Sequence, residues 1–132
     1  PSNSGPKLPE DLYKNEAEQI QRQRQQKEQA WQQEYQELQQ KYETKVEQLQ
    51  NNQSNLRKME ELREEIDDLQ AEIEAFPKEL QEIRIRYLDQ MISLLQRQKG
   101  DQRFQRFSSQ INKRISKLRQ QKKNLVAEAS SW

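Results

Sequence analysis

The chain has 132 residues, of which 34% are charged and only 30% are hydrophobic, and it contains no histidine and no cysteine. These apolar side chains are too few for an ordinary globular core, but they suffice for a narrow seam between helices. Without histidine and cysteine, the sequence excludes Ser-His and Cys-His nucleophiles, histidine metal clusters and zinc ribbons.

The remaining polar residues do not suggest catalysis either. Phosphate-cradling glycine loops are absent. The acidic pairs Glu64-Glu65 and Asp67-Asp68 are neighbours on one solvated helix face and do not converge on a pocket. We therefore expect a protein that is not an enzyme, with no cofactor and no metal site.

Residue composition predicts an all-α fold. Gln, Glu, Lys, Arg and Leu dominate and favour helix, whereas strand-preferring Val is nearly absent. No apolar run approaches the ~18 residues of a membrane span, and the N-terminus has no signal-peptide core. Together with the absence of cysteine, this favours a cytoplasmic, intracellular setting.

The net charge of +1 conceals a strong asymmetry along the chain. Residues 1–55 carry a net charge of −2, residues 56–83 carry −6, residues 84–123 carry +10, and the remaining residues carry −1. The middle of the chain is therefore acidic and its last third is basic.

The chain opens with a segment rich in Pro, Ser and Gly, which predicts a flexible leader over residues 1–11. A Gln-rich helix with imperfect heptads is expected over residues 12–50. Its aromatic stripe of Trp31, Tyr35 and Tyr42 is either a docking surface or part of the seam itself. The Asn- and Ser-containing segment 51–55 is either a register shift within a continuous helix or a turn that ends it, so rod and hairpin both stay open.

The strongest pattern lies in the predicted main coiled-coil segment, residues 56–99. Nine apolar residues alternate in steps of three and four, as an unbroken heptad seam requires. We predict that this heptad seam contacts a partner chain. Its members are Met59, Leu62, Ile66, Leu69, Ile73, Phe76, Leu80, Ile83 and Tyr87.

Proline inside this segment raises the question of where the helix ends. A proline within a helix removes one hydrogen bond and costs ~3 kcal/mol or more. The heptad seam stays in phase across Pro77, so we predict a kink near that residue, with a helix restart there as the alternative. A break is expected near Gly100, because glycine ends helices and the following Asp101 can cap a new one.

The last helix is expected over residues 101–127, followed by a frayed tail over residues 128–132. It combines an apolar ridge with many basic residues, and such helices bind acidic membranes, nucleic acid or acidic protein tails. The alternative is a solvated helix whose charges match an acidic helix. The basic residues that could contact an anion or a partner are Arg103, Arg106, Lys113, Arg114, Lys117, Arg119, Lys122 and Lys123.

Charge also constrains the partner. A parallel homodimer would place the acidic block against itself and the basic block against itself, which is unfavourable. We therefore expect another coiled-coil chain, in a heterodimer or an antiparallel homodimer. An acidic protein surface is a further possible partner, and nucleic acid and membrane are less favoured.

The stretch LQAEIEAFPKELQEIRIRYLDQMISLLQRQKGD resembles a recurrent segment in coiled-coil proteins of the divergent calponin-homology group. This group includes the coiled-coil pairs of the Commander, intraflagellar-transport and outer-kinetochore assemblies. The similarity covers residues 59–101 and consists of a heptad run, the Pro77-Lys78-Glu79 step, Tyr87 and a Gln98-Lys99 ending. It implies a heterodimeric scaffold in trafficking or microtubule-linked machinery.

Two functions follow as hypotheses. The first is a non-catalytic coiled-coil scaffold or oligomerisation segment that mediates protein–protein assembly within a larger trafficking or cytoskeletal complex. The alternative is a polyanion-binding protein that uses the basic C-terminal helix to contact microtubule tails, nucleic acid or an acidic membrane.

Overall fold

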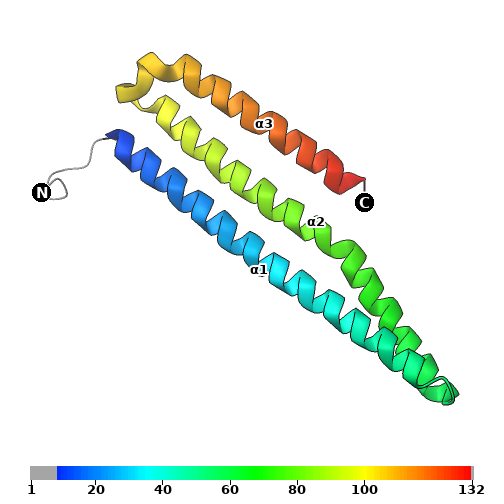
Figure 1. Cartoon of the computed structure of the whole chain (residues 1–132). Coiled ribbons are helices and arrows are strands. Elements are labelled where there is room, and N and C mark those ends of the chain that lie inside the picture. The colour runs from blue at the N-terminus through cyan, green and yellow to red at the C-terminus, as the bar shows by residue number, and fades with distance from the viewer. Residues whose placement is uncertain (1–8, 132) are drawn as a thin grey trace, which may run out of the picture. The chain divides into compact units, whose positions relative to one another are not determined.

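The computed structural model describes residues 9–131, and every regular element in this range is a helix (Figure 1). The fold class is therefore all-α, as predicted. In chain order the elements are α1 (Pro9–Asn51), α2 (Leu56–Gly100), the 3-10 helix η2 (Gln102–Phe107) and α3 (Ser108–Ser130). None of the helices in the described range combines the length and the apolar character that a membrane crossing requires.

Helix α1 begins earlier than the predicted leader allows. Its first residue is Pro9, so residues 9–11 are helical. Proline suits this position, because the first turn of a helix has no acceptor for the amide that proline lacks. The rest of the predicted leader, residues 1–8, lies outside the described residues.

The chain turns between α1 and α2. Helix α1 ends at Asn51, residues 52–54 form turns, and α2 begins at Leu56. The side-chain oxygen of Asn55 accepts a 3.1 Å hydrogen bond from the amide of Lys58, as an N-cap residue does. Of the two interpretations of segment 51–55, the structure therefore has the turn.

Helix α2 runs without a break through Pro77. A helix restart at this residue, the alternative considered from the sequence, does not occur. The missing amide of Pro77 removes one bond of the helix ladder, and the apolar residues on both sides of it still face the neighbouring helix.

The predicted break near Gly100 is present, but the helix after it differs from the prediction. Asp101 caps η2 by accepting a 3.0 Å hydrogen bond from the amide of Arg103. Residues 102–107 then form a 3-10 helix, and the α-helix begins only at Ser108. Short 3-10 helices are common connectors at the start of α-helices, and this one turns Phe104 into the core.

The predicted frayed tail is also mostly helical. Helix α3 continues to Ser130, three residues beyond the predicted end at residue 127. The Ser130 hydroxyl donates to the carbonyl of Val126 at 2.9 Å, and the Ser131 hydroxyl donates to the carbonyl of Glu128 at 2.7 Å. These bonds satisfy carbonyls that the end of a helix would otherwise leave unpaired.

The chain forms two compact units. The first comprises residues 1–27 and 81–132 and is called the basic unit, because its 17 Lys and Arg and 8 Asp and Glu give a net charge of +9. The second comprises residues 28–80 and is called the acidic unit, because its 6 Lys and Arg and 14 Asp and Glu give −8. Both α1 and α2 contribute to each unit.

In the basic unit, three helical segments lie side by side (Figure 1). Helix α3 runs antiparallel to α2, since Lys122 pairs with Asp89 at 2.8 Å whereas Glu128 contacts Gln81 at 3.0 Å. Apolar side chains from all three segments form the core between them. Its buried members are Ile20, Tyr87, Ile92, Leu94, Leu95, Phe104, Ile111 and Ile115.

The acidic unit contains only α1 and α2, which run antiparallel to each other. Trp31 of α1 contacts Phe76 of α2, whereas Lys45 of α1, further along, pairs with the earlier residue Glu65 at 2.8 Å. A hydrogen bond from Lys45 lowers the pKa of the Glu65 carboxyl. Two helices bury an apolar stripe less completely than three, so many apolar residues here stay half-exposed.

Candidate functional site

Three aromatic rings stack in the middle of the acidic unit. Trp31 is buried, and its ring lies 4.9 Å from that of Tyr35 and 5.3 Å from that of Phe76, with interplanar angles of 13° and 16°. The Trp31 indole N–H also donates a 3.0 Å hydrogen bond to the carbonyl oxygen of Phe76. For Trp31 and Tyr35, the structure therefore favours the seam over an exposed docking stripe.

Next to this stack, α1 and α2 line a groove of about 390 Å³. Its apolar part consists of Leu38, Ala75 and Phe76, and Phe76 is held by the aromatic stack. Leu38 and Phe76 are half-buried and Ala75 is exposed. We call this site the acidic groove, because four carboxylates and one lysine complete it. These residues are Glu34, Glu37, Glu72, Glu79 and Lys41.

The carboxylates of the acidic groove are free of ion pairs with the residues that the structure describes. All four are exposed, and within the described part of the chain none of them forms an ion pair. A groove of about 500 Å³ in the basic unit differs in this respect. Its Arg97 pairs with Glu16 at 2.5 Å, and its Asp89 pairs with Lys122.

The heptad seam predicted from the sequence is covered within the chain at the positions where contacts are resolved. Phe76 stacks on Trp31 and Tyr35 of α1, while Ile83 and Tyr87 pack with the buried Ile20 of α1. At these positions the covering helix is α1 of the same chain, and contact of the heptad seam with a partner chain stays a prediction. The physical reason is the turn after Asn51, which folds α1 back onto α2.

Burial varies along the heptad seam. Three of its members are buried and six are half-buried, so part of its apolar surface faces solvent. The buried members are Leu62, Ile66 and Tyr87, and the half-buried members are Met59, Leu69, Ile73, Phe76, Leu80 and Ile83.

The basic residues of the last predicted helix fall into two groups. Three have contacts within the chain: Arg103 with Asp101, Lys122 with Asp89, and the Arg106 guanidinium with the Phe107 ring at 4.9 Å. The other five are exposed on α3 and form no ion pair with described residues. They are Lys113, Arg114, Lys117, Arg119 and Lys123.

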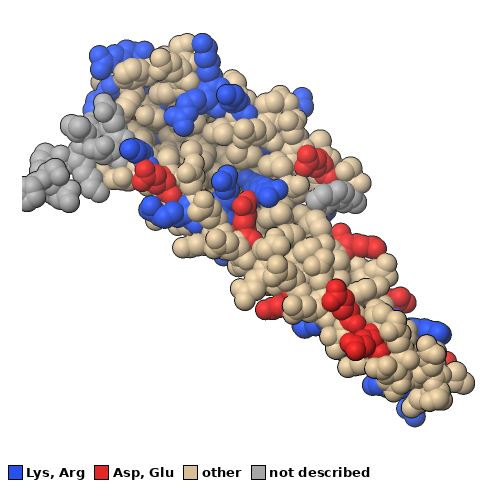
Figure 2. Space-filling view, viewed as in Figure 1, with Lys and Arg blue, Asp and Glu red and all other residues tan. Residues whose placement is uncertain are grey.

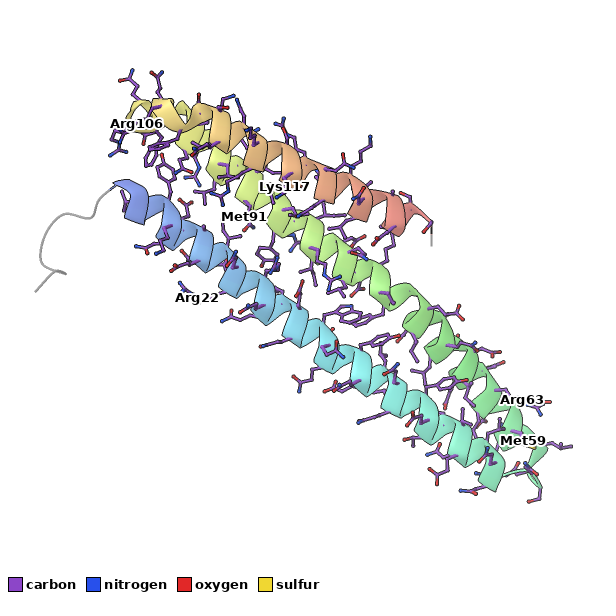
Figure 3. The ribbon with its side chains drawn as sticks, turned by 45° about the horizontal axis from the view of Figure 1, so that its top comes forward. Arg22, Met59, Arg63, Met91, Arg106 and Lys117 are labelled. Atoms are coloured by element: carbon purple, nitrogen blue, oxygen red, sulfur yellow. The ribbon has the colours of Figure 1, made fainter. Side chains whose placement is uncertain are left out.

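Figure 2 shows Lys and Arg side chains gathered at the upper end of the molecule, where η2 and the start of α3 lie. Arg106 and Lys117, labelled in Figure 3, extend from η2 and α3. The apolar face of α3 is buried, because Ile111 and Ile115 lie in the core of the basic unit. The exposed cations of α3 therefore lie on the part of the helix that does not face this core.

A polar junction in the basic unit joins α1 to the start of η2. The Tyr13 hydroxyl donates a 3.0 Å hydrogen bond to Asp101, and the Tyr13 ring packs edge-on against Phe104 at 5.3 Å. The Arg103 guanidinium donates two hydrogen bonds to the Asp101 carboxylate, at 2.9 and 2.6 Å. This junction fixes the turn that brings α3 onto the other two helices.

Ionisation equilibria at the junction are shifted by these contacts. Hydrogen bonds from Arg103 hold the pKa of the Asp101 carboxyl well below its usual range, and the bond from Tyr13 acts in the same direction. Partial burial, followed by the hydrogen bond to Asp101, raises the pKa of Tyr13. The hydrogen bond to Asp101 raises the pKa of Arg103.

Sequence reasoning missed the acidic groove. The groove can be predicted only when the turn at residues 52–54 is known. The turn makes α1 and α2 antiparallel, and the numbers of two residues that face each other on antiparallel helices then add to a nearly constant value. The contact between Trp31 and Phe76 and that between Lys45 and Glu65 follow this rule. Applied to the four glutamates, it places all of them beside one stretch of the helix pair.

In comparisons with known proteins, no family model matches this sequence, and no curated protein and no solved structure matches it either. The resemblance of residues 59–101 to coiled-coil proteins of the divergent calponin-homology group therefore stays a hypothesis based on the residues that suggested it.

Proposed function

We propose that this chain is a non-catalytic helical scaffold that mediates protein–protein assembly within a larger complex, and that the acidic groove is its binding site. The observation that carries the proposal is the groove itself. An apolar floor formed by Leu38, Ala75 and Phe76 remains open in a two-helix unit and is bordered by four unpaired carboxylates. Apolar surface with a polar border is typical of protein-binding sites.

The rigidity of the groove supports this proposal. Phe76 is fixed by stacking on Trp31 and Tyr35 and by the indole hydrogen bond to its own carbonyl. A preformed floor lowers the entropic cost of binding, because its side chains do not have to be ordered by the partner. The groove residues are carboxylates, one lysine and apolar side chains, and the chain offers no histidine or cysteine for nucleophilic chemistry.

An intracellular role in trafficking or cytoskeletal machinery belongs to the same proposal. It rests on the resemblance of residues 59–101 and on the absence of cysteine from the sequence. Within such a complex, the chain would hold other components at a set spacing, as long helical proteins do.

Capture of partners by two matched variants tests the proposal. Ala75→Phe fills the groove with a ring without changing charge, whereas Gln36→Phe adds the same ring at an exposed α1 position that does not line the groove. The tagged chain is incubated in lysate of its source cells, and captured proteins are located on it by crosslinking mass spectrometry. We expect a partner crosslinked beside Lys41 with wild type and Gln36→Phe, and lost with Ala75→Phe. Equal capture by both variants would refute binding through the groove.

Polyanion binding is a second candidate function, favoured by the five exposed and unpaired cations of α3. An electrostatic contact with a polyanion weakens steeply as salt rises. Lys113→Glu with Lys117→Glu should abolish binding at low salt to polyglutamate and duplex DNA, measured by fluorescence anisotropy, and to anionic vesicles, measured by cosedimentation. Absence of binding to all three by the wild-type chain would exclude this candidate.

A further inference from the structure

The same two helices are covered differently in the two units. In the basic unit, α3 packs on α2 and buries Ile111 and Ile115 against Ile92 and Leu95, and Tyr13 of α1 packs against the same cluster. In the acidic unit, α1 and α2 are the only helices. The acidic groove therefore lies on a helix pair that lacks the third helix its counterpart has.

Charge identifies what kind of helix covers such a pair in this protein. Helix α3 carries six Lys and Arg residues and one Glu, so it is a basic amphipathic helix. One of these cations, Lys122, pairs with Asp89 of α2 at 2.8 Å. The basic unit thus contains one example of a basic helix that packs its apolar face on α2 of the helix pair and pairs a border charge with it.

The acidic groove also combines an apolar surface with charged residues at its border, and in the acidic unit no third helix of the described chain covers it. Its apolar floor can receive side chains that project from one face of a helix at positions i, i+3 or i+4, and i+7. Glu34 and Glu37 border it on α1, and Glu72 and Glu79 border it on α2. Basic residues flanking the apolar face of a bound helix would then meet carboxylates on both sides.

We propose that the acidic groove binds a basic amphipathic helix of a partner protein. This inference rests on the proposed function and names the chemistry of the partner. A second copy of the chain is a poorer occupant, because its own basic helix α3 buries Ile111 and Ile115 inside its basic unit. The unpaired carboxylates supply the selectivity, since each would remain unpaired against an acidic or neutral helix.

The test uses the full chain and two designed 22-residue peptides, capped at both ends and labelled with fluorescein. Both have leucines at the a and d heptad positions; one has lysine and the other glutamate at positions e and g. Fluorescence anisotropy measures their affinities. We expect the lysine peptide to bind at least about tenfold more tightly than the glutamate peptide, and less tightly as salt rises.

Two double variants with the same change in net charge separate groove binding from general attraction. Glu37→Lys with Glu72→Lys reverses charges in the groove, whereas Glu60→Lys with Glu64→Lys reverses exposed charges of α2 that do not line it. Circular dichroism verifies that both variants are folded. We expect the groove variant to lose about tenfold or more in affinity for the lysine peptide, and the control to change by less than about threefold.

Each contrary result has a distinct meaning. Equal losses in the two double variants, or equal affinity for the two peptides, would overturn the inference, although a partner that is lost with Ala75→Phe would still support the scaffold function.

 Partner capture by Ala75→Phe tests the scaffold function independently of the charge of the bound helix. Sedimentation equilibrium of the chain without peptide covers the remaining case, because self-association that the groove variant abolishes would mean that a second copy occupies the groove. Failure of both peptides to bind at low salt would also overturn the inference.

Discussion

The indole N–H of Trp31 donates a 3.0 Å hydrogen bond to the carbonyl oxygen of Phe76, the residue that precedes Pro77. A buried indole needs an acceptor, and the carbonyl oxygen of Phe76 supplies it. The same two residues also stack their rings, so one contact joins α1 to α2 through both a polar and an apolar interaction.

Substitutions at Trp31 should separate these two interactions. Trp31→Phe keeps an aromatic ring but loses the hydrogen bond, so we expect a loss of ~0.5–1.5 kcal/mol in the free energy of unfolding. Trp31→Ala removes the ring as well and should cost ~3–5 kcal/mol. Urea denaturation followed by circular dichroism measures both. A loss below about 1 kcal/mol for Trp31→Ala would show that the stack does not hold the acidic unit together.

Gly100 should tolerate a side chain, although a glycine at the end of a helix usually marks a left-handed residue. Its φ is not positive, and a Cβ atom built on it meets nothing within 4 Å. We therefore expect Gly100→Ala to stabilise the protein by ~0.4–1 kcal/mol, because alanine has less conformational freedom to lose on folding. Thermal unfolding measures the change, and a lower melting temperature would contradict the φ of Gly100.

Gln81 is buried and only partly satisfied. Its Nε2 donates a 3.0 Å hydrogen bond to Glu128, while its Oε1 has no partner within the described part of the chain. Replacing this side chain by an apolar one of similar length removes the unpaired oxygen, so Gln81→Met should be neutral or stabilising, by up to ~1 kcal/mol. Glu128→Ala should instead destabilise by ~1 kcal/mol, because it leaves the Nε2 group without its acceptor. If Gln81→Met and Glu128→Ala both lower the melting temperature, the unpaired Oε1 of Gln81 does not destabilise the protein as this argument requires.

Acid should weaken the basic unit through Asp101. The pKa of this carboxyl is lowered from the ordinary value of 3.8, so its contribution is complete above that value and declines as pH falls through the lower pKa of the folded state. Melting temperatures of wild type and Asp101→Asn measured from pH 6 to 2 test this. We expect the stability difference between the two proteins to shrink as the pH falls, and a constant difference would argue against the shift.

Alkali should act on the same junction through Tyr13. Its pKa is raised from 10.0, so its contribution is complete below that value and declines as pH rises through the higher pKa of the folded state. Tyr13→Phe lacks the ionisable group and should lose less stability than wild type between pH 9 and 12. Absorbance at the tyrosinate band provides an independent titration, in which one of the four tyrosines should ionise late.

Helix type and heptad phase could be read from the sequence, but the partner of the heptad seam could not. Steps of three and four from Met59 to Tyr87 show that one face of a helix is apolar, and they do not say which helix covers it. The deciding feature is the turn at residues 52–54, where Asn52 and the flanking Asn51 and Asn55 are weaker signals than Gly or Pro. With that turn, α1 becomes the neighbour of α2, and its own poorer heptads suffice because Trp31 supplies a large buried ring.

The acidic groove could not be predicted for a related reason. Glu34 and Glu72 are distant in sequence, and each alone resembles an ordinary exposed glutamate on a helix. Their shared position depends on the register of the helix pair, which heptads restrict only in steps of seven residues. The 3-10 helix was missed because Phe104 and Phe107 fit a heptad pattern, whereas the Asp101 cap and the Tyr13 contact determine the local backbone.

The order of the units along the chain has a consequence for evolution. The acidic unit is one uninterrupted segment, residues 28–80, placed between the two sequence portions of the basic unit. Inserting or deleting seven residues in both α1 and α2 within that segment would change the length of the helix pair by ~10 Å and keep its heptad phase. The sequence of the basic unit would remain untouched, so the acidic unit can change in length by whole heptads without any change in the residues of the basic unit.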